Sequence, residues 1–116
     1  MNTRKLIRTV TVSASEENET KEFCLEYYVI ARETFLEGGA WETYGIEVLK
    51  RSKTDFGSLR VEYRKVFDVF CTEAEARDAA LLLARNTVTP ISVRDIVEQL
   101  IGTEDIPCEE YEILAV

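Results

Sequence analysis

Apolar and polar residues alternate at every second position over the first seventy residues, which is the period of a β-strand. Leu6, Val10 and Val12 share one parity of the first such run, and the β-branched residues there favour extended backbone. The polar stretch 13–21 and the pair Gly38-Gly39 interrupt the alternation and predict turns. Strands are predicted at about residues 5–12, 22–33, 41–51 and 58–70.

Two positions inside these runs do not fit regular strand pairing. Gly45 lies within the third predicted strand and indicates a bulge or a close aromatic neighbour. Lys65 breaks the parity of the fourth strand, so a bulge or a strand end is expected near it.

The period changes to three or four after residue 71 and predicts two helices, at about 73–85 and 93–101. Thr72 and Glu75 have the spacing of a capping box, and Ser92 is predicted to cap the second helix, with Ile91 and Ile96 as a hydrophobic staple. Neither helix is long enough to be stable alone, so we expect both to pack on the sheet.

The acidic tail, residues 103–116, carries five acidic and no basic residues. Its last part, 109–116, alternates as a short fifth strand would, but a frayed tail explains it equally well, and the tail could also lie against the basic hairpin at 50–65. The chain as a whole predicts a single α+β domain over residues 1–116, with an antiparallel meander of four or five strands followed by two C-terminal helices on one face.

Composition excludes many functions. The 116 residues include no His and have a formal net charge of -8, so mechanisms that need an imidazole are ruled out and nucleic acid or anionic membrane partners are disfavoured. The longest apolar run, residues 79–84, is far shorter than the roughly 20 residues that cross a membrane. Three cysteines without a C-x-x-C motif indicate reduced, structural thiols. We therefore expect a cytoplasmic protein.

The sequence contains no phosphate-binding glycine loop, no nucleophile turn and no calcium-binding loop. It therefore predicts no catalytic, cofactor-binding or metal-binding residues, and a protein that is not an enzyme. A set of aromatic residues is interpreted as sheet core and cross-strand pairs: Tyr27, Tyr28, Trp41, Tyr44, Tyr63 and Phe67.

Partner contact is the function that the remaining pattern favours. The second strand has a mixed face on which Tyr28 and Ile30 are expected to leave apolar surface exposed, and such surface marks contact sites. Arg60 and Arg64, in the basic hairpin, are further candidate contacts. The prediction is an unknown protein partner or a homodimer. The alternative is a small-ligand-binding module with its pocket between sheet and helices.

Residues 81–98, LLLARNTVTPISVRDIVE, are similar to the C-terminal signature of a family of short bacterial proteins of unknown function. The strand phrase Tyr44-Gly45-Ile46-Glu47, and Glu26-Tyr27-Tyr28 before it, resemble the same family. The likeness covers roughly residues 22–102. It implies a small cytoplasmic bacterial protein and carries no assigned site residues.

Overall fold

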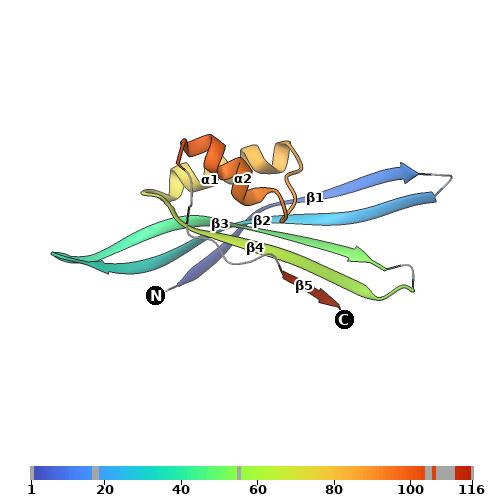
Figure 1. The fold of residues 1–116 in the computed structure, drawn as a ribbon, viewed down its shortest axis with the longest axis horizontal. Helices are drawn as coiled ribbons and strands as arrows, with labels where there is room; N and C mark the ends of the chain where they lie inside the picture. Colours follow the sequence, from blue (N-terminus) through green and yellow to red (C-terminus); the bar gives the residue numbers. More distant parts are fainter. Residues whose placement is uncertain (1, 17–18, 55, 104–105, 107–111, 116) are drawn as a thin grey trace.

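The structure is a computed structural model that describes residues 2–16, 19–54, 56–103, 106 and 112–115. Its strands form one antiparallel sheet in the order β1-β2-β3-β4-β5, and the two helices lie together on one side of it (Figure 1). The strands are β1 (Thr3–Glu16), β2 (Glu19–Leu36), β3 (Gly39–Lys53), β4 (Leu59–Phe70) and β5 (Glu112–Ala115). The helices are α1 (Glu73–Arg85) and α2 (Val93–Ile101). The predicted α+β meander with two C-terminal helices is confirmed.

The end of the chain forms the fifth strand, which the sequence left open. β5 pairs antiparallel with β4, from Tyr63↔Glu112 to Arg60↔Ala115. The segment therefore lies beside the strand that carries part of the basic hairpin. Residues 104–105 and 107–111, which hold the other acidic residues of the predicted tail, are outside the described residues.

The strands are longer than predicted, and three hairpins extend beyond the helices (Figure 1). Much of the polar stretch predicted as a loop continues the pairing of β1 with β2, from Ser13↔Glu22 to Glu16↔Glu19. Past the helices neither face of a strand is covered, so polar residues suit both faces and the alternation disappears while the backbone ladder continues. The molecule is accordingly elongated, with extents of 59 × 26 × 23 Å.

The hydrophobic core lies between the sheet and the helices. We call this side of the sheet the helix face. Its buried strand residues are Leu25, Tyr27, Val29, Ile46, Val48 and Val66, and α1 supplies Ala76, Ala79, Ala80, Leu83 and Ala84. The many alanines let α1 approach the strands closely, and it contacts each of β1 to β4. The Tyr27 hydroxyl donates a hydrogen bond to the Val88 carbonyl oxygen at 2.9 Å, which ties the sheet to the connection between the helices.

A bulge in β1 reverses the predicted role of Leu6. The register with β2 shifts between Leu6 and Arg8, so Leu6 lies opposite Tyr28 and is half-exposed, while Ile7 packs against the core. The expected grouping of Leu6 with Val10 and Val12 is therefore wrong, because one extra residue exchanges the faces of the strand.

A second irregularity, between β3 and β4, confirms the expected bulge. Gly45 lies between Tyr44↔Phe70 and Ile46↔Val66, where the register shifts. A Cβ atom on Gly45 would be 1.9 Å from the Val66 carbonyl oxygen, so the close neighbour is backbone and not an aromatic ring. Asp68, on the bulged strand, has a φ of 55°. Asp tolerates this left-handed conformation better than most residues.

The two helices begin differently. The backbone N–H of Glu75 donates to the Thr72 hydroxyl at 3.2 Å, and this hydroxyl donates to the Glu75 carboxylate at 2.9 Å, which confirms the cap at Thr72. Ser92 precedes α2 but makes no side-chain capping bond, and Ile91 is mostly exposed. Ser92 therefore lies at the predicted N-cap position, but its side chain does not form the predicted cap, and the staple of Ile91 with Ile96 stays a prediction. Ser92 has helical backbone angles there, whereas a capping residue is typically extended.

Candidate functional site

The side of the sheet away from the helices carries a network of charged and aromatic side chains. We call this side the open face. Alternation along the strands places on it the side chains of Arg4, Glu26, Tyr28, Ile30, Arg32, Thr43, Glu47, Leu49, Arg51 and Lys65. Helices do not cover this face (Figure 1), so whatever buries its side chains must come from the sheet itself.

The first ion pair of the open face joins β1 to β3. The Arg4 Nε lies 3.0 and 3.1 Å from the two Glu47 carboxylate oxygens, and Nη2 lies 2.8 Å from Oε2. Glu47 is only 2% exposed, so this bidentate contact supplies the charge that its burial requires. The hydrogen bond to Glu47 raises the pKa of Arg4.

The same arginine covers an aromatic ring. Its guanidinium carbon lies 3.6 Å from the ring centre of Tyr28, a cation–π arrangement. The Tyr28 hydroxyl donates to Glu26, and Arg51 donates to the other oxygen of Glu26 at 2.6 Å. Burial opposes ionisation of Glu26, but these two hydrogen bonds outweigh it and lower the pKa of the carboxyl group.

The second ion pair lies at the β3–β4 bulge. Arg32 donates to both carboxylate oxygens of Asp68, with Nε 2.8 Å from Oδ1, and the Thr43 hydroxyl donates to the same Oδ1 at 2.6 Å. The guanidinium also lies over the Phe67 ring, 4.3 Å from its centre. The hydrogen bond from Arg32 is the main cause of the lowered pKa of Asp68.

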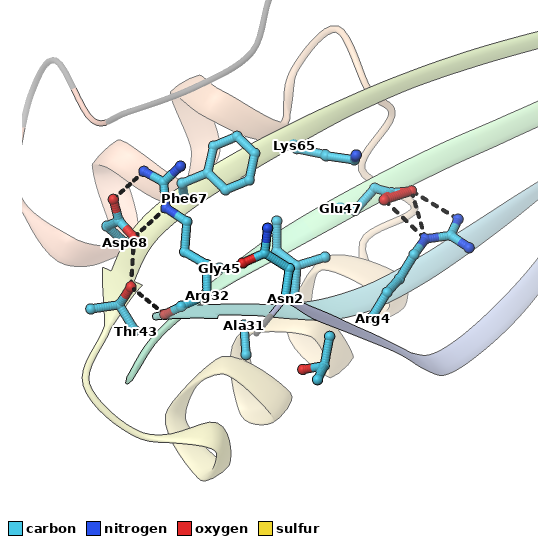
Figure 2. A pocket seen from close by; sticks show the side chains of 12 residues that line it. Asn2, Arg4, Ala31, Arg32, Thr43, Gly45, Glu47, Lys65, Phe67 and Asp68 are labelled. Atoms are coloured by element: carbon cyan, nitrogen blue, oxygen red, sulfur yellow. Dashed lines mark hydrogen bonds and ion pairs between the residues drawn. The ribbon is translucent and has the colours of Figure 1, made fainter. Parts of the chain in front are cut away.

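Between the two ion pairs the open face is hollowed. Figure 2 shows Arg4 with Glu47 on one side of this hollow and Arg32 with Asp68 on the other. Its volume is ≈ 340 Å³, room for a small molecule. Lys65 and Phe67 of β4 line one wall, and Gly45 lies between the ion pairs. Among the described residues Lys65 has no ion-pair partner, so its ammonium group is available to a small anion.

The sequence can now be placed among known proteins. A family model described as a family of unknown function (DUF6514) matches residues 7–103. The chain belongs to this family. No curated protein and no solved structure matches it. The DUF6514 match confirms the resemblance found in the sequence and assigns no activity. It spans Ile7 to Thr103, which includes Gly45 and both helices, and leaves Arg4 and β5 outside.

The structure does not bring the four predicted contact residues of this DUF6514 protein together. Tyr28 and Ile30 lie on the open face as expected, but each is 7% exposed, so the expectation of exposed apolar surface there is wrong. The Arg4 guanidinium group covers the Tyr28 ring, so this side chain is buried although helices do not cover the open face. Whether either residue contacts a partner stays a prediction.

The two arginines lie on the other side of the sheet. Arg60 and Arg64 pair with Ser52 and Val48, which places them on the helix face. Arg60 forms an ion pair with Glu62 at 3.0 Å, and Arg64 donates to the Ile91 carbonyl oxygen at 3.4 Å. A shared contact surface with Tyr28 would need a partner that reaches both faces. The partner role of the two arginines also stays a prediction.

The sequence analysis missed two exposed aromatic residues of the β2–β3 hairpin; Phe56, between β3 and β4, is exposed as well. Trp41, interpreted as sheet core, is 57% exposed, and Phe35 is 76% exposed. Trp41 and Phe35 belong to this hairpin, which extends beyond the helices (Figure 1). Both residues lie within three positions of the Gly38-Gly39 turn, and this could have indicated their exposure. Side chains near the tip of a long hairpin are not covered by the helices.

Two features are absent from the ranges that the structure describes. Neither α1 nor α2 reaches the length and hydropathy that crossing a bilayer requires. Within the same ranges, no three His, Cys, Asp or Glu side chains gather in a way that could hold a metal ion.

Proposed function

We propose that this DUF6514 protein acts by contact with another protein and is not an enzyme, and that the β2–β3 hairpin is the contact element. One observation carries the proposal: Phe35 and Trp41 are exposed on a hairpin that projects away from the core. Trp is enriched among the residues that dominate binding energy at protein interfaces. Large exposed aromatic side chains lower the solubility of a protein unless a partner covers them.

The charges around the aromatic residues indicate the chemistry of the partner. Exposed glutamates lie in the hairpin turn, at Glu37, and on the strands beside it, at Glu33 and Glu42. An apolar centre with a charged rim is the usual anatomy of an interface. Phe35 pairs with Ala40 and Trp41 with Thr34, so the two aromatic side chains lie on opposite faces of the hairpin. A protein with an apolar cleft that encloses the hairpin tip, edged by Lys or Arg side chains, would be complementary to it.

Affinity capture from the native cell, followed by mass spectrometry, tests the proposal. The double variant Phe35→Ser/Trp41→Ser is compared with the unchanged protein and with Ile91→Ser, which removes an exposed apolar side chain from the connection before α2. We expect a protein that both the unchanged chain and Ile91→Ser capture, and that the hairpin variant loses. Equal capture by all three chains, with unchanged circular dichroism, would contradict the proposal.

A small-ligand-binding module is the second candidate, and the hollow of the open face favours it. The hollow lies on the side of the sheet opposite the position predicted from the sequence, which was between sheet and helices. Its lining includes the Lys65 ammonium group, the Phe67 ring and the Thr43 hydroxyl, which suits a small carboxylate or phosphate ester.

A thermal-shift screen of small carboxylates and phosphate esters tests this candidate. A compound that binds the folded chain raises its melting temperature by mass action. We expect Lys65→Gln to abolish such a shift, and Lys53→Gln, at an exposed position of β3, to preserve it. A shift of equal size in both variants would place the binding elsewhere.

A further inference from the structure

One edge of the sheet is formed by β1, whose outer backbone groups face no further strand of the described chain. The strand is 14 residues long. An edge of this length is a template for pairing with another chain, and soluble proteins usually protect such edges with charges, bulges, prolines or a covering element.

The protection of β1 is confined to its first half. Arg4, Lys5 and Arg8 lie there, together with the bulge after Leu6. Helix α1 is also close to this half, since Lys5 forms an ion pair with Glu73 at 3.3 Å. These features hinder the approach of another strand to residues 3–7.

The part of β1 from Thr9 to Ser15 has none of these features. Residues 9–15, TVTVSAS, contain no charge, Pro or Gly, and their pairing with β2 is regular from Thr9↔Glu26 to Ser15↔Thr20. This part of β1 extends past the helices (Figure 1). Val10 and Val12 are half-buried at the margin of the core, so a strand added beside them would cover more of their apolar surface.

The charges at the two ends of this part indicate which strand would be added. Arg8 precedes the uncharged run and Glu16 follows it. Two copies of this segment placed antiparallel about Val12 would set Arg8 of each copy opposite Glu16 of the other, with Thr11 opposite Ser13. Every pair in this register joins residues of the same face, as an antiparallel ladder requires. The opposite charges at both ends favour this register over shifted ones.

We propose that residues 8–16 of β1 pair antiparallel with the same residues of a second copy, so that two sheets join into one continuous sheet. The pairing uses a surface different from the β2–β3 hairpin and goes beyond the proposed function. Phe35→Ser/Trp41→Ser is therefore expected to leave it intact, so failure of either proposal is distinguishable from failure of the other.

Sedimentation velocity over a range of protein concentrations in 0.15 M salt tests the pairing. At this ionic strength charges are screened beyond about 8 Å, so the repulsion between two anionic chains is reduced. The key variant is Thr11→Lys/Ser13→Lys. Both positions are exposed in the single chain, but in the proposed register each lysine faces a lysine of the other copy. Like charges directly opposite are unfavourable.

We expect a dimer for the unchanged chain and a dissociation constant raised at least about tenfold in the lysine variant, which corresponds to about 1.4 kcal/mol. Ala40→Lys/Ser58→Lys, which adds the same charge at two other exposed positions, is expected to remain dimeric. An equimolar mixture of Thr11→Lys/Ser13→Lys with Thr11→Glu/Ser13→Glu should restore the dimer, because each lysine then faces a glutamate.

Three results would overturn the proposal. The first is a monomer at all concentrations up to the solubility limit. The second is a dimer that the lysine variant does not weaken, since the interface would then lie elsewhere. The third is a lysine variant that dissociates but is not rescued by the glutamate variant, since the register would then be wrong. Circular dichroism of each variant distinguishes dissociation from unfolding.

Discussion

The two faces of the sheet are buried by different means. On the helix face, Leu25, Tyr27 and Val29 belong to the apolar core that lies between the sheet and the helices. On the open face, Tyr28 and Ile30 are nearly as buried, although helices do not cover them. There the covering groups are arginine side chains, whose flat guanidinium groups lie over aromatic rings while they bind carboxylates.

The two faces therefore contribute to the stability of the fold through different interactions. Apolar burial under helices depends on close packing and not on charge, so salt does not screen it. A layer of partly exposed ion pairs contributes less, and its contribution decreases with added salt and with protonation of the carboxylates. Four predictions test this division, from the largest expected effect to the smallest.

Substitution of Gly45→Ala is expected to have the largest effect, because the backbone of β4 leaves no room for a side chain at Gly45. The new Cβ would meet the Val66 carbonyl oxygen at 1.9 Å, and this oxygen belongs to the backbone of a core strand. To remove this overlap β4 must move away from β3, and this movement disturbs both Val66 on the helix face and Asp68 on the open face. We expect a loss of about 3 kcal/mol or more in the free energy of unfolding, measured by urea denaturation.

Gly38→Ala is the matched control. A Cβ at Gly38 would meet nothing within 4 Å, although its φ of 96° still disfavours a side chain. Its cost is expected to stay at about 1 kcal/mol. Equal losses in the two variants would show that the close approach at Gly45 has no special role.

Tyr27 and Tyr28 compare the faces at adjacent positions. Tyr27→Phe leaves the buried Val88 carbonyl oxygen without its 2.9 Å hydrogen bond, which is expected to cost about 1–3 kcal/mol. Tyr28→Phe removes one of the two donors to Glu26, while Arg51 still binds this carboxylate, and should cost less than about 1 kcal/mol. Urea denaturation of both variants measures the difference. The reverse order would contradict the division between the faces.

The third prediction concerns the pH dependence of stability in alkali, and it tests the burial of Tyr27 on the helix face. Burial raises the pKa of Tyr27 from 10.0 to about 12. The neutral phenol is therefore favoured by folding, and its contribution is complete below pH 10 and lost as the pH rises toward 12. The unchanged chain should lose more stability between these pH values than Tyr27→Phe, measured by urea denaturation at each pH. Parallel curves for the two proteins would contradict the burial of a neutral Tyr27.

Much of the fold was predictable because it depends on local periodicity. Alternation identified the four long strands, and the change of period at residue 71, together with Thr72 and Glu75, placed the start of α1 at the observed residue. Gly45 indicated the bulge because a glycine weakens the interior of a strand and often marks an irregularity in its pairing. Strand ends were less predictable, since backbone pairing continues past the helices where side-chain burial no longer marks it.

The candidate site was not predictable, because it depends on register and on bulges. The shift after Leu6 determines which residues of β1 face Glu47, and the shift at Gly45 brings Asp68 to Arg32. The sequence pattern indicated that one face of β2 is mixed, but not that Arg4, 43 residues away from Glu47, would close it. Arg60 and Arg64 were grouped with Tyr28 and Ile30 for the same reason: parity within one strand does not give the face of another.

Asp68→Asn is expected to have the smallest effect, and it isolates the charge of the open face. Asn tolerates the φ of 55° at this position about as well as Asp, so the bulge should persist while the ion pair with Arg32 is lost. Because folding lowers the pKa of Asp68 from its ordinary 3.8, the ionised carboxylate stabilises the protein above that pH. This stabilisation disappears as the pH falls through the lowered value. The variant should lose about 1 kcal/mol or less at pH 7 and low salt, and less still in 1 M salt. Thermal unfolding from pH 7 to pH 2 should show the two proteins converging in acid, and a constant difference down to pH 2 would mean that the carboxylate charge does not stabilise this face.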